Sequence, residues 1–136
     1  MIVFDASAVV SAALRENSVP EQALLQAEET DVFALSPEVD AEIASVLERP
    51  RFATAVSAAR RTRILDVLRG SAVWFNPSER VADCRDVKDN KYLELALASS
   101  AWAVVSGDTD LLVLHPWRGV RILRPADYLA DVTKGA

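Results

Sequence analysis

The sequence has one cysteine, one histidine and no long hydrophobic run, and each shortage excludes a class of protein. A single thiol, Cys84, cannot form an internal disulfide, and with only His115 beside it the chain lacks the ligands of a zinc site. No stretch approaches the roughly 20 apolar residues of a membrane span, and the N-terminus shows no signal-peptide pattern. We therefore expect a cytoplasmic protein without disulfides, structural zinc or a membrane partner.

A shortage of positive charge excludes a uniformly basic surface. The 136 residues include 20 Asp and Glu against 15 Lys and Arg, a formal net charge of −5. Nonspecific coating of nucleic acid is therefore excluded, whereas a local basic patch is not. Hydrophobic residues make up 51% of the chain, enough for the core of one domain. We expect that domain over residues 1–132, with a frayed C-terminus at 133–136.

Short apolar runs alternate with helical patterns along the chain. Ser36 and Pro37, for example, suit the N-cap and first position of a helix that Pro50 ends. Strands are expected at 2–4, 31–35, 71–77, 101–106 and 119–123, and helical segments at 6–16, 21–29, 38–49, 51–70, from about 86–89 to 100, 108–114 and 125–132. Strands that alternate with helices predict a three-layer α/β/α sandwich around a mainly parallel five-stranded sheet.

Aspartates stand directly after two of the predicted strands. Asp5 follows the first strand, and Asp108 follows the strand at 101–106, with Asp110 two residues further on. Parallel sheets place their ligand sites at the carboxyl ends of the strands. If these two strands are neighbours in the sheet, Asp5 and Asp108 can share one crevice.

Helical periodicity adds further acids. Asp89 lies in line with the apolar stripe of the helix that follows it, so its side chain is expected to face inward over the sheet edge. In the helix that starts after Ser36, Glu42 and Asp40 flank opposite edges of the apolar stripe. Periodicity alone does not choose between these two.

Each acid also has a purely structural explanation. Asp5 and Asp108 suit N-caps, Asp86 and Asp89 suit the start of a helix, and a residue such as Glu42 suits a solvated flank. These explanations do not predict that the acids converge at one end of one sheet. Carboxylates about 4 Å apart repel by about 4 kcal/mol at an effective dielectric constant near 20. A convergent group therefore needs raised pKa values or a bound cation, and its oxygen ligands suit Mg²⁺ or Mn²⁺.

Four segments, taken in order, carry a resemblance to a known family. They are VFDASAVVSAAL, LSPEVDAEIASVLERPRF, CRDVKDNKYLELALA and VVSGDTDLL. Together they resemble the PIN-domain ribonucleases, the family that includes the VapC-type toxins of bacterial toxin–antitoxin pairs. The resemblance covers nearly the whole chain and implies that four acids bind metal and act in catalysis: Asp5, Glu42, Asp89 and Asp108. It thereby selects Glu42 over Asp40.

The chain also departs from the family pattern. The family often has Asp-Thr-Asn where this chain has Asp5-Ala6-Ser7, and Thr in place of Ser106. Ser7 keeps a hydroxyl where the family has an amide, so the surroundings of the acid change while the acid is retained. Secondary roles around the metal are expected for three residues: Ser7, Asp86 and Asp110.

The resemblance implies a divalent-metal-dependent endoribonuclease that hydrolyses phosphodiester bonds of single-stranded RNA with Mg²⁺ or Mn²⁺. It further implies the toxin of a type II toxin–antitoxin pair, with an antitoxin partner and a homodimer. Lys88, Lys91 and Arg49 lie near the proposed ligands and are expected to bind RNA. One alternative is an RNA-processing PIN nuclease without an antitoxin. Another, a phospho-accepting receiver-like domain, is disfavoured because only one acid follows the first strand and no lysine follows the last.

Overall fold

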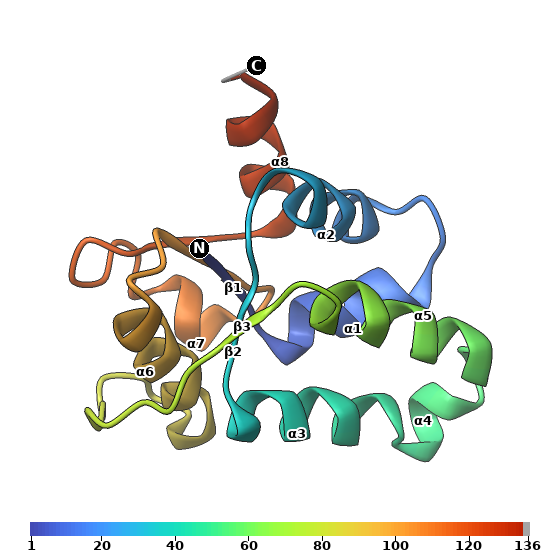
Figure 1. The fold of residues 1–136 in the computed structure, drawn as a ribbon, viewed down its shortest axis with the longest axis horizontal. Coiled ribbons are helices and arrows are strands. Elements are labelled where there is room, and N and C mark those ends of the chain that lie inside the picture. The colour runs from blue at the N-terminus through green and yellow to red at the C-terminus, as the bar shows by residue number, and fades with distance from the viewer. Residues whose placement is uncertain (135–136) are drawn as a thin grey trace.

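Five short parallel strands form the centre of the molecule (Figure 1), in a computed structural model that describes residues 1–134. Strands β1 (Ile2–Phe4), β4 (Ala103–Val105) and β5 (Arg121–Leu123) pair in the order β1-β4-β5. Strands β2 (Ala34–Leu35) and β3 (Val73–Trp74) form a second parallel ladder. A parallel bridge between Ile2 and Phe33 connects the two ladders. The predicted mainly parallel five-stranded α/β architecture is confirmed.

The register of β1 and β4 sets the position of the acids. Phe4 lies opposite Val105, and the Asp5 amide donates to the Val105 carbonyl over 3.0 Å. The next residues, Asp5 and Ser106, therefore leave the sheet side by side at its carboxyl edge. Because β1 and β4 are neighbours, the condition for a shared crevice is met.

The helices begin where the sequence provides caps. The side-chain oxygens of Ser18, Ser36 and Ser57 each accept a backbone N–H in the first turn of the helix that follows. The cap at Ser57 explains why the segment 51–70 forms two helices and not one. The helices are α1 (Ala6–Leu14), α2 (Val19–Thr30), α3 (Pro37–Leu47), α4 (Pro50–Ala53), α5 (Ala58–Arg69), the 3₁₀ helix η1 (Val87–Asp89), α6 (Asn90–Ser99), α7 (Thr109–Leu112) and α8 (Pro125–Lys134).

Helix α8 continues through part of the segment that was expected to fray. It runs to Lys134, whereas 135–136 lie outside the described residues. None of the helices within residues 1–134 combines the length and the apolar character of a membrane span.

The helices cover the strands from two sides. Figure 1 shows α6 and α7 on one side of the strands and α1, α2 and α5 on the other. Between the layers the core is apolar and aromatic: Phe4 packs edge-to-face against Phe33 and Tyr128, with ring centroids 5.5 and 6.0 Å apart. All three rings are buried. This packing fixes the ends of β1 and β4, from which the candidate site is built.

Candidate metal centre and its cleft

Asp5 occupies the junction between β1 and α1. Its Oδ1 accepts hydrogen bonds from the Ala8 amide at 2.9 Å and the Ser7 hydroxyl at 2.7 Å, and its Oδ2 accepts one from the Ser106 hydroxyl. The side chain is buried, and this burial raises the pKa of the carboxyl to about 6, against the hydrogen bonds and with a further push from the charge of Asp108. Asp5 therefore caps α1 and lines the cleft at the same time.

Asp108 caps α7 on the neighbouring strand end. Its Oδ1 accepts the Asp110 amide at 2.9 Å, and its own amide donates to the Ser106 hydroxyl at 2.9 Å. The buried Ser106 hydroxyl therefore links the backbone of Asp108 to the carboxylate of Asp5. The Asp110 side chain is not among those lining the cleft.

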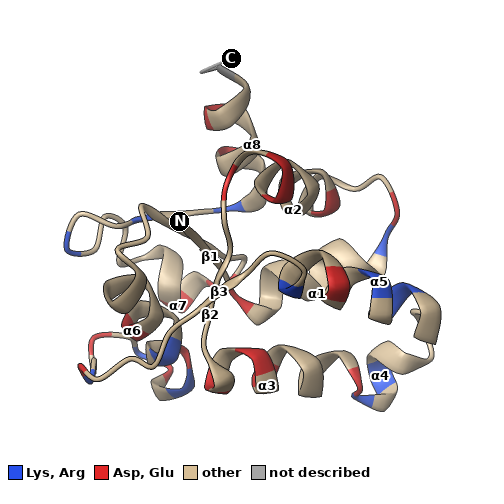
Figure 2. Cartoon of the chain, in the orientation of Figure 1, with Lys and Arg blue, Asp and Glu red and all other residues tan. Residues whose placement is uncertain are grey.

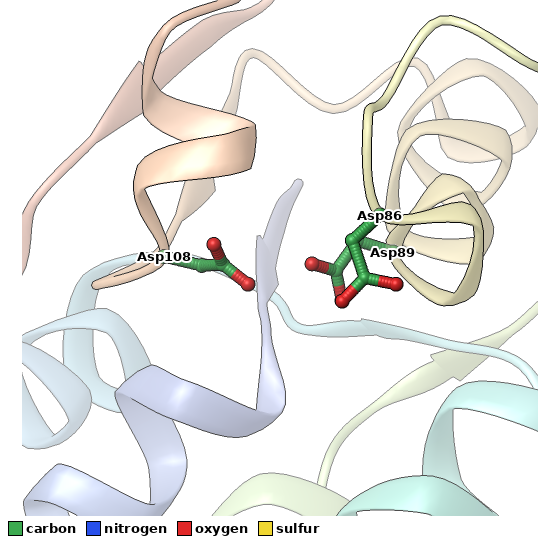
Figure 3. Close-up of side chains that lie close together, drawn as sticks. All are labelled: Asp86, Asp89 and Asp108. Atoms are coloured by element: carbon green, nitrogen blue, oxygen red, sulfur yellow. The ribbon is translucent and has the colours of Figure 1, made fainter.

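Asp86 and Asp89 approach from the segment before α6. Figure 3 shows both carboxylates facing Asp108 across a short gap. One carboxylate oxygen from each of Asp86, Asp89 and Asp108 lies within 4.8 Å of the other two. Asp89 is 9% exposed, and its Oδ2 is buried without a hydrogen-bond partner among the described residues. Asp86, expected in a secondary role, thus lies in the most compact group of acids.

The three carboxylates cannot all stay ionised without compensation. At 4.8 Å two such charges repel by roughly 3.5 kcal/mol at an effective dielectric constant of about 20. Burial raises the pKa of Asp89 to about 8, and the nearby carboxylates of Asp108, Asp86 and Asp5 act in the same direction. In the metal-free protein, a proton on Asp89 relieves the repulsion.

A divalent cation would relieve the same repulsion, and the donor set fits one. Every group at the site is a carboxylate oxygen, the ligand type that Mg²⁺ and Mn²⁺ prefer. The buried Oδ2 of Asp89 lacks a protein partner and is available to a ligand. The nearby thiol of Cys84 has its pKa raised by burial and by the surrounding acids, so it stays protonated and adds no soft ligand.

Glu42 lines the cleft from α3. Its carboxylate accepts hydrogen bonds from the Lys91 ammonium and from the Tyr92 hydroxyl, which itself accepts the Ala6 amide at 3.2 Å. Tyr92 is buried, and both its burial and its bond to Glu42 raise the pKa of the phenol. Glu42 lines the same cleft as Asp5, Asp89 and Asp108 but is not part of the compact three-acid group.

The contacts of Asp40 distinguish it from Glu42, which periodicity alone could not do. The Asp40 carboxylate pairs with Arg69 through contacts of 2.6 and 3.0 Å and does not line the cleft. Tyr92 and Ser106 are residues of the site that local sequence patterns mark only weakly. Tyr92 belongs to the apolar stripe of the helix after Asp89, and Ser106 is a departure from the family pattern.

Of the basic residues expected to bind RNA, Arg49 and Lys88 line the cleft. Lys91 does not; its ammonium pairs with Glu42. Figure 2 shows basic residues near α4 and below α6. Arg51 also lines the cleft. Within residues 1–134, none of the ion pairs involves Arg49, Arg51 or Lys88.

His115 takes no part in this site. Its Nδ1 accepts the Ile122 amide at 2.9 Å, which ties the loop to β5. Arg60 and Arg61 are likewise occupied elsewhere: Arg60 donates to the carbonyls of Ala12 and Ala13 at 2.8 Å, and Arg61 donates to nearby backbone carbonyls.

Comparison with known proteins gives two matches. A family model described as PIN domain matches residues 1–110, a range that includes Asp5, Glu42, Asp89 and Asp108. The uncharacterized protein MJ1680 of Methanocaldococcus jannaschii is 31% identical over 116 residues, which cover 84% of this chain and 74% of that protein. The name of that protein states no activity.

The charge of the site predicts how stability depends on pH. Folding raises the pKa of Asp89 from 3.8 to about 8, so the metal-free folded protein keeps a proton that the unfolded chain has released. Its stability therefore falls as the pH rises between these two values. We expect the melting temperature of metal-free protein to decrease from pH 5 to pH 8, and to decrease less in Asp89→Asn. Equal decreases in both proteins would contradict this assignment.

The hydroxyl of Tyr92 is expected to orient Glu42 toward the metal centre. Removing it in Tyr92→Phe leaves the ring in the core but frees the Glu42 carboxylate from one of its two partners. We expect Mn²⁺ affinity, measured by titration calorimetry, to fall about 10- to 100-fold, as for other residues that orient ligands. Tyr128→Phe, at a buried tyrosine outside the cleft, is the matched control. Equal affinity in both variants would show that Tyr92 does not act on the site.

Proposed function

The chain belongs to the PIN domain family, and from this premise we propose that it is a divalent-metal-dependent endoribonuclease that cleaves single-stranded RNA. PIN domains are typically nucleases, and the acidic group of this chain can bind a metal. The observation that carries the proposal is the approach of Asp86, Asp89 and Asp108 to within 4.8 Å, with Asp5 joined to Asp108 through Ser106.

Each residue of the cleft has a place in this proposal. Asp5, Asp89 and Asp108, with Asp86 beside them, would hold Mg²⁺ or Mn²⁺. The bound ion supplies a water of lowered pKa and neutralises charge that develops on the phosphate. Glu42 completes the proposed catalytic set from α3, kept in place by Lys91 and Tyr92. Ser7 and Ser106 orient the carboxylate of Asp5.

We assign substrate binding to the basic residues of the cleft that form no ion pair among the described residues. Arg49 and Lys88 line the cleft, so their charges can meet phosphates on the two sides of the scissile bond. The chain needs no serine, cysteine or histidine nucleophile, in keeping with the position of His115 away from the cleft. The overall negative charge is compatible with RNA binding because Arg49, Arg51 and Lys88 line the cleft beside the acids.

The biological role is a finer proposal. We propose that the chain is the toxin of a toxin–antitoxin pair, that it forms a homodimer and that an antitoxin blocks its cleft; the support is the motif resemblance to VapC-type toxins. An RNA-processing nuclease without an antitoxin is the second candidate. A gene for a short protein beside this one, whose product relieves growth arrest, would favour the toxin. The receiver-like alternative loses its basis with the family assignment.

RNA cleavage by matched variants tests the nuclease. Wild-type protein is expected to cut a labelled single-stranded RNA pool with Mg²⁺ or Mn²⁺ and not with EDTA. Asp108→Asn removes a proposed ligand, so its rate should fall by more than about 100-fold, beyond the usual loss for residues that only orient ligands. Asp127→Asn, at an exposed acid of α8, is the control and should cut like wild type. Cleavage that survives EDTA or Asp108→Asn would contradict the proposal.

A further inference from the structure

The cleft has two halves of different chemistry. One half contains the acids at the carboxyl edge of the sheet. The other half is apolar, with two arginines at its rim, and the metal centre makes no use of it. Within the cleft of about 650 Å³, this second half is lined by Val10, Leu14, Val46, Phe52, Arg49 and Arg51. We call these six residues the apolar half-cleft.

Helices α1 and α3 line the cleft along its length, from the acids to the apolar half-cleft. Ala6, Val10 and Leu14 line it at intervals of four residues on one face of α1, and Glu42 and Val46 do the same on α3. Figure 1 shows α1 and α3 leaving the strands in the same direction, toward α4. From Ala6 to Leu14 the rise of an α-helix gives about 12 Å. The apolar half-cleft is therefore a continuation of the acidic site along the helices.

Part of the apolar half-cleft stays open to solvent, although Val10 is buried and Val46 and Phe52 pack against the core. Leu14 is 42% exposed, and Phe52 is only partly buried. The guanidinium of Arg51 lies 5.9 Å from the centroid of the Phe52 ring. Neither Arg49 nor Arg51 has an acidic partner among the described residues, so both charges are available to an anion. A partly exposed aromatic ring next to free cations is the combination that binds a nucleobase and its phosphate.

We propose that the apolar half-cleft is a nucleobase-binding subsite. The base of a nucleotide next to the scissile phosphate stacks on Phe52 and packs against Leu14, while Arg49 and Arg51 contact the adjoining phosphate. The subsite rests on the proposed nuclease function and adds a choice of which nucleotide is bound beside the cut. Charge complementarity favours RNA over an apolar segment of a partner protein, because two free guanidinium groups require anions where the apolar wall begins.

Binding of abasic RNA tests the subsite without relying on catalysis. The Asp108→Asn protein, in Mg²⁺, is titrated with a labelled short single-stranded RNA and with copies that each lack one base. We expect one position at which loss of the base weakens binding about 5- to 100-fold, the range of a single stacked base. Phe52→Leu in the same background should weaken binding of intact RNA by a similar factor and remove the sensitivity at that position. Phe52→Trp should keep it.

Two further variants separate the subsite from general effects. Because Phe52 is partly packed, Leu14→Gln provides a second test at a more exposed position and should also reduce the sensitivity to the missing base. Val113→Ala, at a 70% exposed residue outside the cleft, should behave as the parent protein. Melting curves of all variants confirm that each is folded at the assay temperature.

Each result bears on one proposal. The subsite is overturned if loss of a base weakens binding at no position of the RNA. It is also overturned if Phe52→Leu weakens binding of intact and abasic RNA equally. RNA binding that Phe52→Leu and Leu14→Gln both leave unchanged also overturns it and points to a protein occupant. If the wild type cleaves RNA with metal but Phe52→Leu does not change RNA binding, the subsite is contradicted and the nuclease is supported. If Phe52→Leu weakens RNA binding but the wild type does not cleave RNA, the subsite is supported and the nuclease is contradicted.

Discussion

The repulsion among carboxylates at the carboxyl edge of the sheet is the constraint on which this structure depends. Asp86, Asp89 and Asp108 lie too close to remain ionised together, and Asp5 is buried beside them. The strands, caps and core fix the backbone positions of these residues, and their stabilisation of the fold outweighs the repulsion. In the proposed function a divalent cation would remove this repulsion, so the unfavourable arrangement of charge would become affinity for metal. The same feature that weakens the metal-free protein would then favour binding of an ion.

Hydroxyl groups hold this arrangement together across the fold. Ser106 joins the two strand ends through Asp5 and the backbone of Asp108, and Tyr92 joins α1 to α3 through Ala6 and Glu42. Apart from the local bond between the Asp108 amide and Ser106, these contacts bridge segments far apart in the sequence, so they form only when the layers are assembled. The apolar half-cleft then extends the site along α1 and α3, where we propose that the base of an RNA substrate binds.

Some of this arrangement could be predicted from the sequence because it follows from local rules. Asp5 and Asp108 follow apolar strands, and the geometry of parallel sheets places such residues at one edge. The inward direction of Asp89 follows from the period of the next helix. Glu42 could not be separated from Asp40 in this way, since both flank one stripe; the difference lies in tertiary partners, Lys91 and Tyr92 for one and Arg69 for the other.

The remaining features depend on contacts that no local pattern contains. Asp86 joins the compact group because the segment before α6 brings it toward Asp108, and Lys91 pairs with Glu42 because α3 and α6 are neighbours. The most direct measurement of the central claim is a calorimetric titration of metal-free protein with Mn²⁺ at pH 7, repeated in buffers of different ionisation enthalpy. With Asp89 titrating at about 8, binding should release close to one proton, and Asp89→Asn should abolish that release. Absence of binding, or binding with no proton released by the wild type, would contradict the account.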